Sequence, residues 1–131
     1  MKIEANNLEA NAHLAVPASG SGPGVLVLHP WWGLNEDIKN VADRLAEAGF
    51  VALAPDLYNG RIATTIEQAG EYADALDEDA ARAIVRAAAA ALQNHDACLP
   101  GPIGVIGFSL GAMFGIWLAH AQPEQVSAVV L

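Results

Sequence analysis

The sequence predicts an α/β protein with a mostly parallel sheet and helices on both faces. Three short apolar runs without polar alternation, residues 25–29, 50–55 and 102–108, have the composition of strands that are buried on both sides. Stretches with apolar residues at helical spacing separate these runs. Such alternation of strands and helices is typical of a parallel sheet with right-handed crossover connections.

The first part of the chain predicts a sheet edge and then a strand–helix unit. Residues 2–16 are polar with alternating apolar members, which suits a short antiparallel pair at the edge. Residues 17–24 read PASGSGPG and predict a turn. After the strand at 25–29, Asn35 is expected to cap a helix that ends at Gly49.

The rest of the chain continues this alternation. Two helices are expected at about 65–76 and 78–94, ahead of the strand at 102–108. Residues 110–121, LGAMFGIWLAHA, are apolar on nearly every side, which predicts a buried helix. The run VSAVVL at 126–131 is expected to begin a fourth strand.

Length and composition predict a single domain over residues 1–131. The apolar fraction is 53 % and the charged fraction 16 %, which is far from the composition of disordered chains. The formal net charge of −9 disfavours partners such as nucleic acid and anionic membranes, because both repel an acidic surface. We interpret the charge as a property that keeps the protein in solution.

Cysteine and histidine usage gives further expectations. Cys98 is the only cysteine, so no disulfide can form within the chain, and an inert, half-buried thiol is expected rather than a reactive one.

The N-terminus has no apolar signal-peptide core, and no apolar run approaches the roughly 18 residues of a membrane span. We therefore expect a cytoplasmic protein. The histidines show no metal-ligand spacing and no phosphate loop is present, so neither a metal nor a cofactor is expected.

The segment IGVIGFSLGAMFG, residues 103–115, predicts a nucleophilic serine. Its motif Gly107-x-Ser109-x-Gly111 falls between a buried strand and an apolar helix, where a sharp turn presents a serine at the carboxyl edge of a sheet. Glycines at both flanking positions leave room for the strand and the helix to approach. Composition alone would produce this spacing in roughly a few chains per hundred, but chance seldom supplies the flanking strand and helix as well.

Two backbone N–H groups are expected to form an oxyanion hole beside Ser109. One belongs to Leu110, and the other comes from the loop HPWWG. Because Pro30 has no N–H, Trp31 is the candidate donor. The indole of Trp32 is expected to line the substrate pocket. Packing of both tryptophans over the core is the alternative, and it is compatible with donation from the backbone.

Two segments, VLVLHPWWGLNEDIKNVADRLAEAGFVALAPDLYNGR and IGVIGFSLGAMFG, resemble the dienelactone hydrolase family of α/β hydrolases. The resemblance extends from about residue 10 to residue 131. It implies the α/β-hydrolase fold, with the C-terminal strands and helix missing from this chain. It also implies hydrolysis of a carboxylic ester or lactone through an acyl-enzyme on Ser109. The rival hypothesis is a non-catalytic α/β module that retains the serine turn and binds a small molecule or a partner through its PWWG loop.

The chain departs from the best-known members of that family at two positions. They have a cysteine nucleophile where this chain has Ser109, and a glutamate that helps to activate the thiol where it has Pro30. The resemblance therefore implies a conventional Ser-His-Asp route and supports dienelactone itself as the substrate less strongly. Family members hold the substrate carboxylate with an arginine after DLY. Arg61 is the nearest match, displaced by Asn59 and Gly60, and its alternative role is that of a structural loop charge.

The sequence shows no evident general base for Ser109. In this fold the triad runs Ser, Asp, His along the chain. His120 would lie roughly 16 Å from Ser109 along a helix that rises about 1.5 Å per residue. His95 precedes the serine strand at the opposite end of the sheet, and His13 lies in the edge region. His29 ends a neighbouring strand. It is a weak candidate for the base and is expected instead to orient the oxyanion loop by a hydrogen bond.

The remaining acid near the site, Asp56, is expected to bond its own backbone as a turn carboxylate. We therefore expect the catalytic Asp and His from beyond residue 131, and the apolar strand at 126–131 agrees with this because a bare sheet edge is an aggregation hazard. The chain would be the N-terminal part of a longer hydrolase: a shortened form, a partial sequence, or half of an assembly completed by a second chain. Alone it is expected to be nearly inactive, with a rate at most about three to four orders of magnitude above that of the uncatalysed reaction in water.

Overall fold

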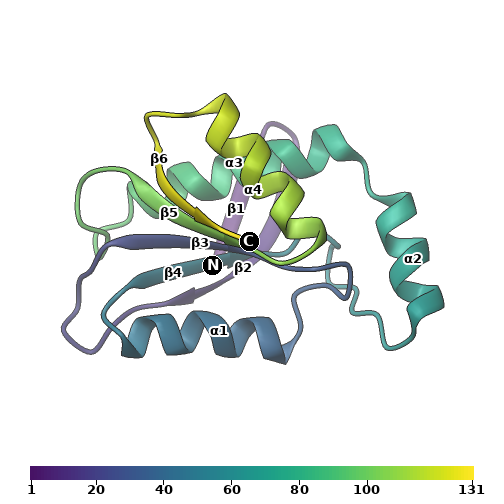
Figure 1. Ribbon diagram of the computed structural model, residues 1–131, viewed down its shortest axis with the longest axis horizontal. Helices are drawn as coiled ribbons and strands as arrows, with labels where there is room; N and C mark the ends of the chain where they lie inside the picture. The colour runs from purple at the N-terminus through teal and green to yellow at the C-terminus, as the bar shows by residue number, and fades with distance from the viewer.

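The computed structural model describes residues 1–131 as one six-stranded sheet with four helices (Figure 1). The strands are β1 (Lys2–Ala5), β2 (Leu8–Ala15), β3 (Gly24–Leu28), β4 (Val51–Pro55), β5 (Ile103–Gly107) and β6 (Val126–Val130). The helices are α1 (Glu36–Glu47), α2 (Ile66–Ala75), α3 (Glu78–Gln93) and α4 (Leu110–Ala121).

The sheet has a parallel centre and an antiparallel edge. Its strand order is β1-β2-β4-β3-β5-β6. Neighbouring strands from β4 to β6 are parallel, while β2 pairs antiparallel with β4 and β1 pairs antiparallel with β2. The predicted α/β class and the antiparallel pair at the edge are confirmed, and each parallel strand begins and ends within one residue of its expected bounds.

The boundaries of α1 follow from its caps. The side-chain oxygen of Asn35 accepts a hydrogen bond from the Ile38 N–H at 3.2 Å, and Glu36 and Asp37 occupy the first turn, where negative charge complements the helix dipole. Gly49 follows the helix with a φ of 103°, a left-handed conformation that glycine adopts at little cost. The predicted cap and stop signals are confirmed.

Helices cover the two faces of the sheet, as Figure 1 shows, with α1 on one face and α3 and α4 on the other. The helix α2 lies beyond the carboxyl ends of the parallel strands. Alternate residues of β3 serve the two cores: Val27 packs on the α1 side, whereas Leu26 and Leu28 pack with the residues of α3. Burying each such side chain contributes about 1.5–3 kcal/mol, so β3 joins both layers.

The prediction of a fully buried α4 is wrong for one side of the helix. Phe114 and Leu118 are buried, but Met113 is 59 % exposed and Ile116 is 53 % exposed. The physical reason is the position of α4 at the end of the helical layer, where it packs against α3, β5 and β6 and has no element on its outer side. The edge strand β6 pairs only with β5, and its Val130 is 59 % exposed.

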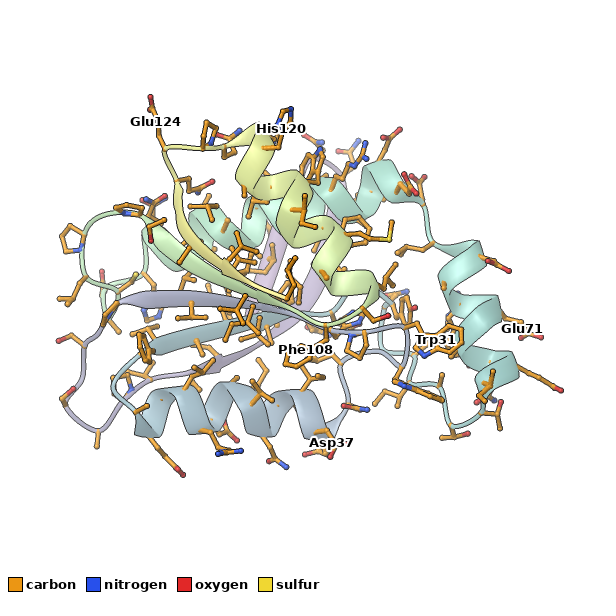
Figure 2. All side chains as sticks on the ribbon, viewed as in Figure 1. Trp31, Asp37, Glu71, Phe108, His120 and Glu124 are labelled. Atoms are coloured by element: carbon orange, nitrogen blue, oxygen red, sulfur yellow. The ribbon has the colours of Figure 1, made fainter.

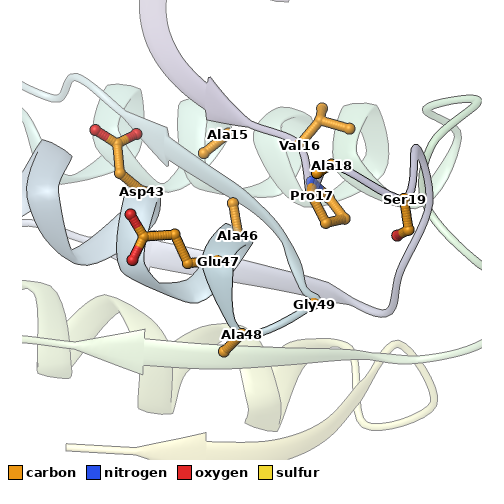
Figure 3. Close-up of a pocket in the computed structure, with 10 residues that line it drawn as sticks. All are labelled: Ala15, Val16, Pro17, Ala18, Ser19, Asp43, Ala46, Glu47, Ala48 and Gly49. Carbon is orange, nitrogen blue, oxygen red and sulfur yellow. The ribbon is translucent and has the colours of Figure 1, made fainter.

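A hollow of about 690 Å³ lies between the turn after β2 and the end of α1 (Figure 3). The turn between β2 and β3 bounds it on one side, and the last turns of α1, with Asp43 and Glu47, bound it on the other. Because these segments precede the parallel strands β3 and β4, the hollow belongs to the amino ends of the sheet. None of the four helices combines the length and the apolarity that crossing a membrane requires.

Candidate functional site

The candidate site is centred on Ser109, which occupies the turn between β5 and α4. Its backbone has φ 52° and ψ −109°, a combination that costs a non-glycine residue roughly 1–3 kcal/mol and is maintained only when the surroundings impose it. The side chain is exposed and its Oγ makes no hydrogen bond with another protein group. Strand and helix therefore hold an exposed hydroxyl in a strained conformation at the carboxyl edge of the sheet.

The two flanking glycines make this turn sterically feasible. A Cβ at Gly107 would be 2.7 Å from the Ala112 Cα. A Cβ at Gly111 would be 2.6 Å from the Leu28 carbonyl carbon and 2.7 Å from the His29 oxygen. Distances under about 3 Å to backbone atoms cannot be relieved by a rotamer change. The expectation that glycine is needed on both sides of the serine is confirmed.

Of the two candidate oxyanion donors, Leu110 begins α4 directly after Ser109, and Trp31 lies in the loop after β3. Trp31 follows Pro30 in a tight turn that is closed by a hydrogen bond from the Gly33 N–H to the Pro30 carbonyl at 3.0 Å. The Trp31 N–H donates to no backbone acceptor. Leu110 is the first residue of α4, where the N–H groups of the first turn have no acceptor within the helix. Figure 2 shows Trp31 toward α2, whereas Phe108, which precedes the serine, lies between the sheet and α1.

The loop that carries Trp31 is bonded to the loop after β4. The Ala63 N–H donates to the Trp32 carbonyl at 2.9 Å. At Gly33, where φ is 97°, a Cβ would be 2.6 Å from the Arg61 carbonyl oxygen, so only glycine permits this approach. The two indoles of Trp31 and Trp32 meet edge to face, with ring centroids 5.8 Å apart. Donation from backbone and packing of the rings thus coexist in one loop.

His29 lies beneath these loops and is fully buried. Its Nδ1 is 2.7 Å from the Pro30 carbonyl oxygen, and its Nε2 accepts a hydrogen bond from the Leu57 N–H at 3.0 Å. The first contact requires a proton on Nδ1 and the second requires a lone pair on Nε2, which together define the neutral imidazole. Burial lowers the pKa of His29. With both nitrogens engaged, His29 has none free to serve as a base for Ser109.

The other histidines are also separated from the serine. His13 bonds Asp43 at 2.8 Å between β2 and α1, and the Nδ1 of His95 accepts from the Ala97 N–H. His120 lies at the far end of α4 from the serine turn (Figure 2). No histidine of this chain is hydrogen-bonded to Ser109 Oγ, in agreement with the sequence-based expectation.

Asp56 has the structural role expected from the sequence. Its carboxylate accepts hydrogen bonds from the Tyr58 N–H at 2.8 Å and the Gly60 N–H at 2.7 Å. Only 8 % of the residue is exposed. Both carboxylate oxygens are therefore used in shaping the loop DLYNGR, which sets the position of Arg61.

Arg61 lines a pocket that includes neither Ser109 nor Leu110. Its guanidinium carbon is 5.4 Å from the centroid of the Tyr72 ring, a cation–π distance. These two residues line a pocket of about 180 Å³ together with Tyr58, whose hydroxyl is buried without a hydrogen-bond partner. Burial raises the pKa of Tyr58.

A second hollow of about 300 Å³ borders the serine turn through Leu110. Its apolar walls come from α4, with Met113, Phe114 and Trp117. Arg82 of α3 closes its side and lies 5.3 Å from the Trp117 ring centroid. This hollow was not foreseen, because it depends on how two helices far apart in the sequence pack together.

Cys98 and the acidic residues offer no metal centre. No group of three or more His, Cys, Asp or Glu side chains converges in the chain. Cys98 is buried and its thiol donates to the Leu99 carbonyl at 3.5 Å. Burial raises the pKa of the Cys98 thiol, which disfavours the reactive thiolate.

Comparison with known proteins matches nearly the whole chain to one family. The dienelactone hydrolase family matches residues 10–131. Protein usf of Aquifex pyrophilus is 35 % identical over 136 residues, which cover 99 % of this chain and 58 % of that protein. A carboxymethylenebutenolidase of Pseudomonas sp. strain P51 is 37 % identical over 111 residues, which cover 76 % of this chain and 45 % of that protein.

Two solved structures are similar to the chain over nearly its whole length. The structure named m3DLH has a TM-score of 0.85 and 29 % identity, with 98 % of this chain covering 55 % of it. The dienelactone hydrolase-like promiscuous phosphotriesterase P91 from metagenomic libraries has a TM-score of 0.80 and 26 % identity, over 98 % of this chain and 56 % of that one. The chain therefore spans about half the length of the relatives that it matches.

Proposed function

Because the chain belongs to the dienelactone hydrolase family, we propose that it is part of a serine hydrolase that cleaves a carboxylic ester or lactone. The observation that supports this most directly is the strained, exposed Ser109 on a glycine-flanked strand-to-helix turn. A strained backbone at an exposed polar residue is a feature of functional sites. The hydroxyl has no structural hydrogen bond to lose when it reacts.

In the proposed reaction, Ser109 Oγ attacks the acyl carbon while a general base takes its proton. The new Oγ–C bond forms as the carbonyl π bond breaks, and negative charge collects on the carbonyl oxygen. The N–H groups of Leu110 and Trp31 are suited to stabilise that charge, and the N-terminus of α4 adds its dipole. Collapse of the intermediate breaks the bond from the acyl carbon to the alkoxy oxygen. That oxygen takes the proton from the general base and becomes a neutral alcohol, and water then hydrolyses the acyl-enzyme.

We propose that the acid and the base come from beyond residue 131. Two observations support this. The chain covers 58 % and 45 % of the lengths of two relatives, and none of its own histidines is bonded to Ser109. The exposed side of α4 at Met113 and Ile116, and the unpaired edge of β6, provide an apolar surface for that continuation or for a complementary chain. Without it, the chain alone would be nearly inactive.

We propose that the substrate is a small molecule with an apolar acyl group. The indoles of Trp31 and Trp32 stand on the loop that carries the second oxyanion donor. The 300 Å³ hollow beside Leu110 presents apolar side chains of α4 next to charged ones, which are Asp74, Glu78 and Arg82. Arg61 would act as a carboxylate-binding group at the periphery, although its contact with Tyr72 equally fits a structural charge. The lone, buried Cys98 thiol agrees with a reducing, cytoplasmic location.

Labelling with a fluorophosphonate tests the proposal. Such a probe forms a bond between serine Oγ and phosphorus and releases fluoride, so it reports an activated serine. The longer protein that carries this chain and its continuation should be labelled rapidly, and Ser109→Ala should abolish labelling. The exposed Ser19 supplies a control, because Ser19→Ala should be labelled like the wild type. A folded longer protein that resists the probe would refute the hydrolase and favour the non-catalytic binding module.

A further inference from the structure

We propose that His29 is a positioning residue whose neutral imidazole joins the loop after β3 to the loop after β4, so that the oxyanion hole and the DLYNGR loop are set as one unit. The inference rests on the proposed function of Ser109, Leu110 and Trp31. It concerns a side chain that does not touch the reacting atoms and acts through the backbone of its neighbours.

The first half of the connection fixes the turn that presents Trp31. The Pro30 carbonyl accepts from His29 Nδ1 at 2.7 Å and from the Gly33 N–H at 3.0 Å. These two bonds hold the peptide plane between Pro30 and Trp31, which contains the Trp31 N–H. The direction of that N–H therefore depends on the imidazole.

The second half reaches the loop after β4. The Leu57 N–H donates to His29 Nε2 at 3.0 Å. The next residue, Tyr58, packs edge-on against the imidazole with ring centroids 5.0 Å apart, and Tyr72 packs against Tyr58 at 5.9 Å. A displacement of this loop is therefore transmitted to the imidazole through a hydrogen bond and an aromatic contact.

The backbone of His29 also touches the serine turn. A Cβ on Gly111 would be 2.7 Å from the His29 carbonyl oxygen, so His29 lies directly beneath the first turn of α4. One residue thus contacts the three segments that carry Ser109, Trp31 and Arg61.

Protonation would break this arrangement. A proton on Nε2 would point at the Leu57 N–H, which is itself a donor. Asp56 is the charged group that acts on the imidazole and favours its protonated form, whereas burial opposes it more strongly. Tyr58, the other titratable group against the ring, stays neutral because burial raises its pKa.

Three substitutions of His29 distinguish a role in positioning the loops by hydrogen bonds from a role in packing alone. The amide nitrogen of His29→Asn can reach the place of Nδ1 and retain the bond to Pro30. The longer amide of His29→Gln can replace Nε2 and retain only the bond from Leu57. His29→Phe keeps a ring and loses both bonds.

The measurement is the rate of fluorophosphonate labelling of Ser109 in the longer protein, with nitrogen-15 NMR of the histidine and of the Trp31 amide. We expect His29→Asn to label within about threefold of the wild type, and His29→Gln and His29→Phe to label roughly tenfold to 100-fold more slowly. The chemical shift of the Trp31 amide should change least in His29→Asn and more in His29→Gln and His29→Phe. Equal rates for all three variants would overturn the proposal.

The NMR spectrum of the wild type provides a second test that needs no variant to fold. We expect a proton on Nδ1 and none on Nε2 at neutral pH, and the opposite tautomer would overturn the proposal. Absence of labelling in the wild type would refute the hydrolase instead. In that case the Trp31 amide shifts of the Asn and Gln variants still decide whether His29 positions the loop.

Discussion

Gly111 in α4 lies against the carbonyl group of Leu28 in β3 so closely that a Cβ on the glycine would be 2.6 Å from the carbonyl carbon. This contact joins the strand before the Trp31 loop to the helix after Ser109. The Phe108 N–H strengthens the junction by donating to the Leu28 carbonyl at 3.1 Å. The segments that carry the two candidate oxyanion donors, the end of β3 with its loop and the start of α4, therefore meet at one crowded backbone junction.

Substituting Gly111 by alanine should destabilise the fold because the new methyl group meets backbone that cannot rotate away. We expect a loss of about 3 kcal/mol or more in the free energy of unfolding, measured by urea denaturation. The matched control is Gly70→Ala in α2, where a Cβ meets nothing within 4 Å. This control should gain about 0.5–1 kcal/mol, because alanine is the better helix former. A tolerated Gly111→Ala would contradict the close approach.

Replacing Ser109 should expose the strain in the serine turn. Both Ser109→Ala and Ser109→Gly remove the hydroxyl, but only glycine adopts φ 52° without a Cβ penalty. We expect the glycine variant to be more stable than the alanine variant by about 1 kcal/mol in urea denaturation, although glycine ordinarily loses more chain entropy. Equal stability of the two variants would argue against a strained turn. Neither variant should react with a fluorophosphonate.

Asp56 should contribute to stability through two hydrogen bonds, one buried and one partly buried. Asp56→Ala leaves the N–H groups of Tyr58 and Gly60 without their acceptors, and the buried donor of Tyr58 alone costs about 1–3 kcal/mol when it is unsatisfied. Asp56→Asn keeps one acceptor oxygen and should lose about half as much. Thermal or urea unfolding gives both values. A loss below about 1 kcal/mol in the alanine variant would show that water satisfies these donors.

The strands and the serine turn were predictable because their signals are local. An unbroken apolar run such as that of β3 or β4 predicts burial on both faces, and the glycines around Ser109 predict crowding within five consecutive residues. The capping of α1 by Asn35 is likewise encoded within one helical turn.

Features that depend on distant neighbours were not predictable. The apolar sequence of α4 is the same whether or not another element covers it, so Met113 and Ile116 were wrongly expected to be buried. The contact of His29 with Leu57 joins residues 28 positions apart and leaves no periodic pattern. The hydrogen bond from Nδ1 to Pro30, in contrast, is local and agrees with the orienting role inferred from the sequence.

Replacing His29 by glutamine should remove a pH-dependent part of the stability. Burial lowers the pKa of His29 below its ordinary value of 6.5, so near that pH the unfolded chain binds more protons than the folded chain. The stabilisation from a neutral His29 is complete above about pH 6.5 and is lost as pH falls toward the lowered pKa, at up to about 1.4 kcal/mol per pH unit. Urea denaturation between about pH 8 and pH 5 should therefore show a steeper loss in the wild type than in His29→Gln. Equal slopes in the two proteins would contradict a buried neutral imidazole.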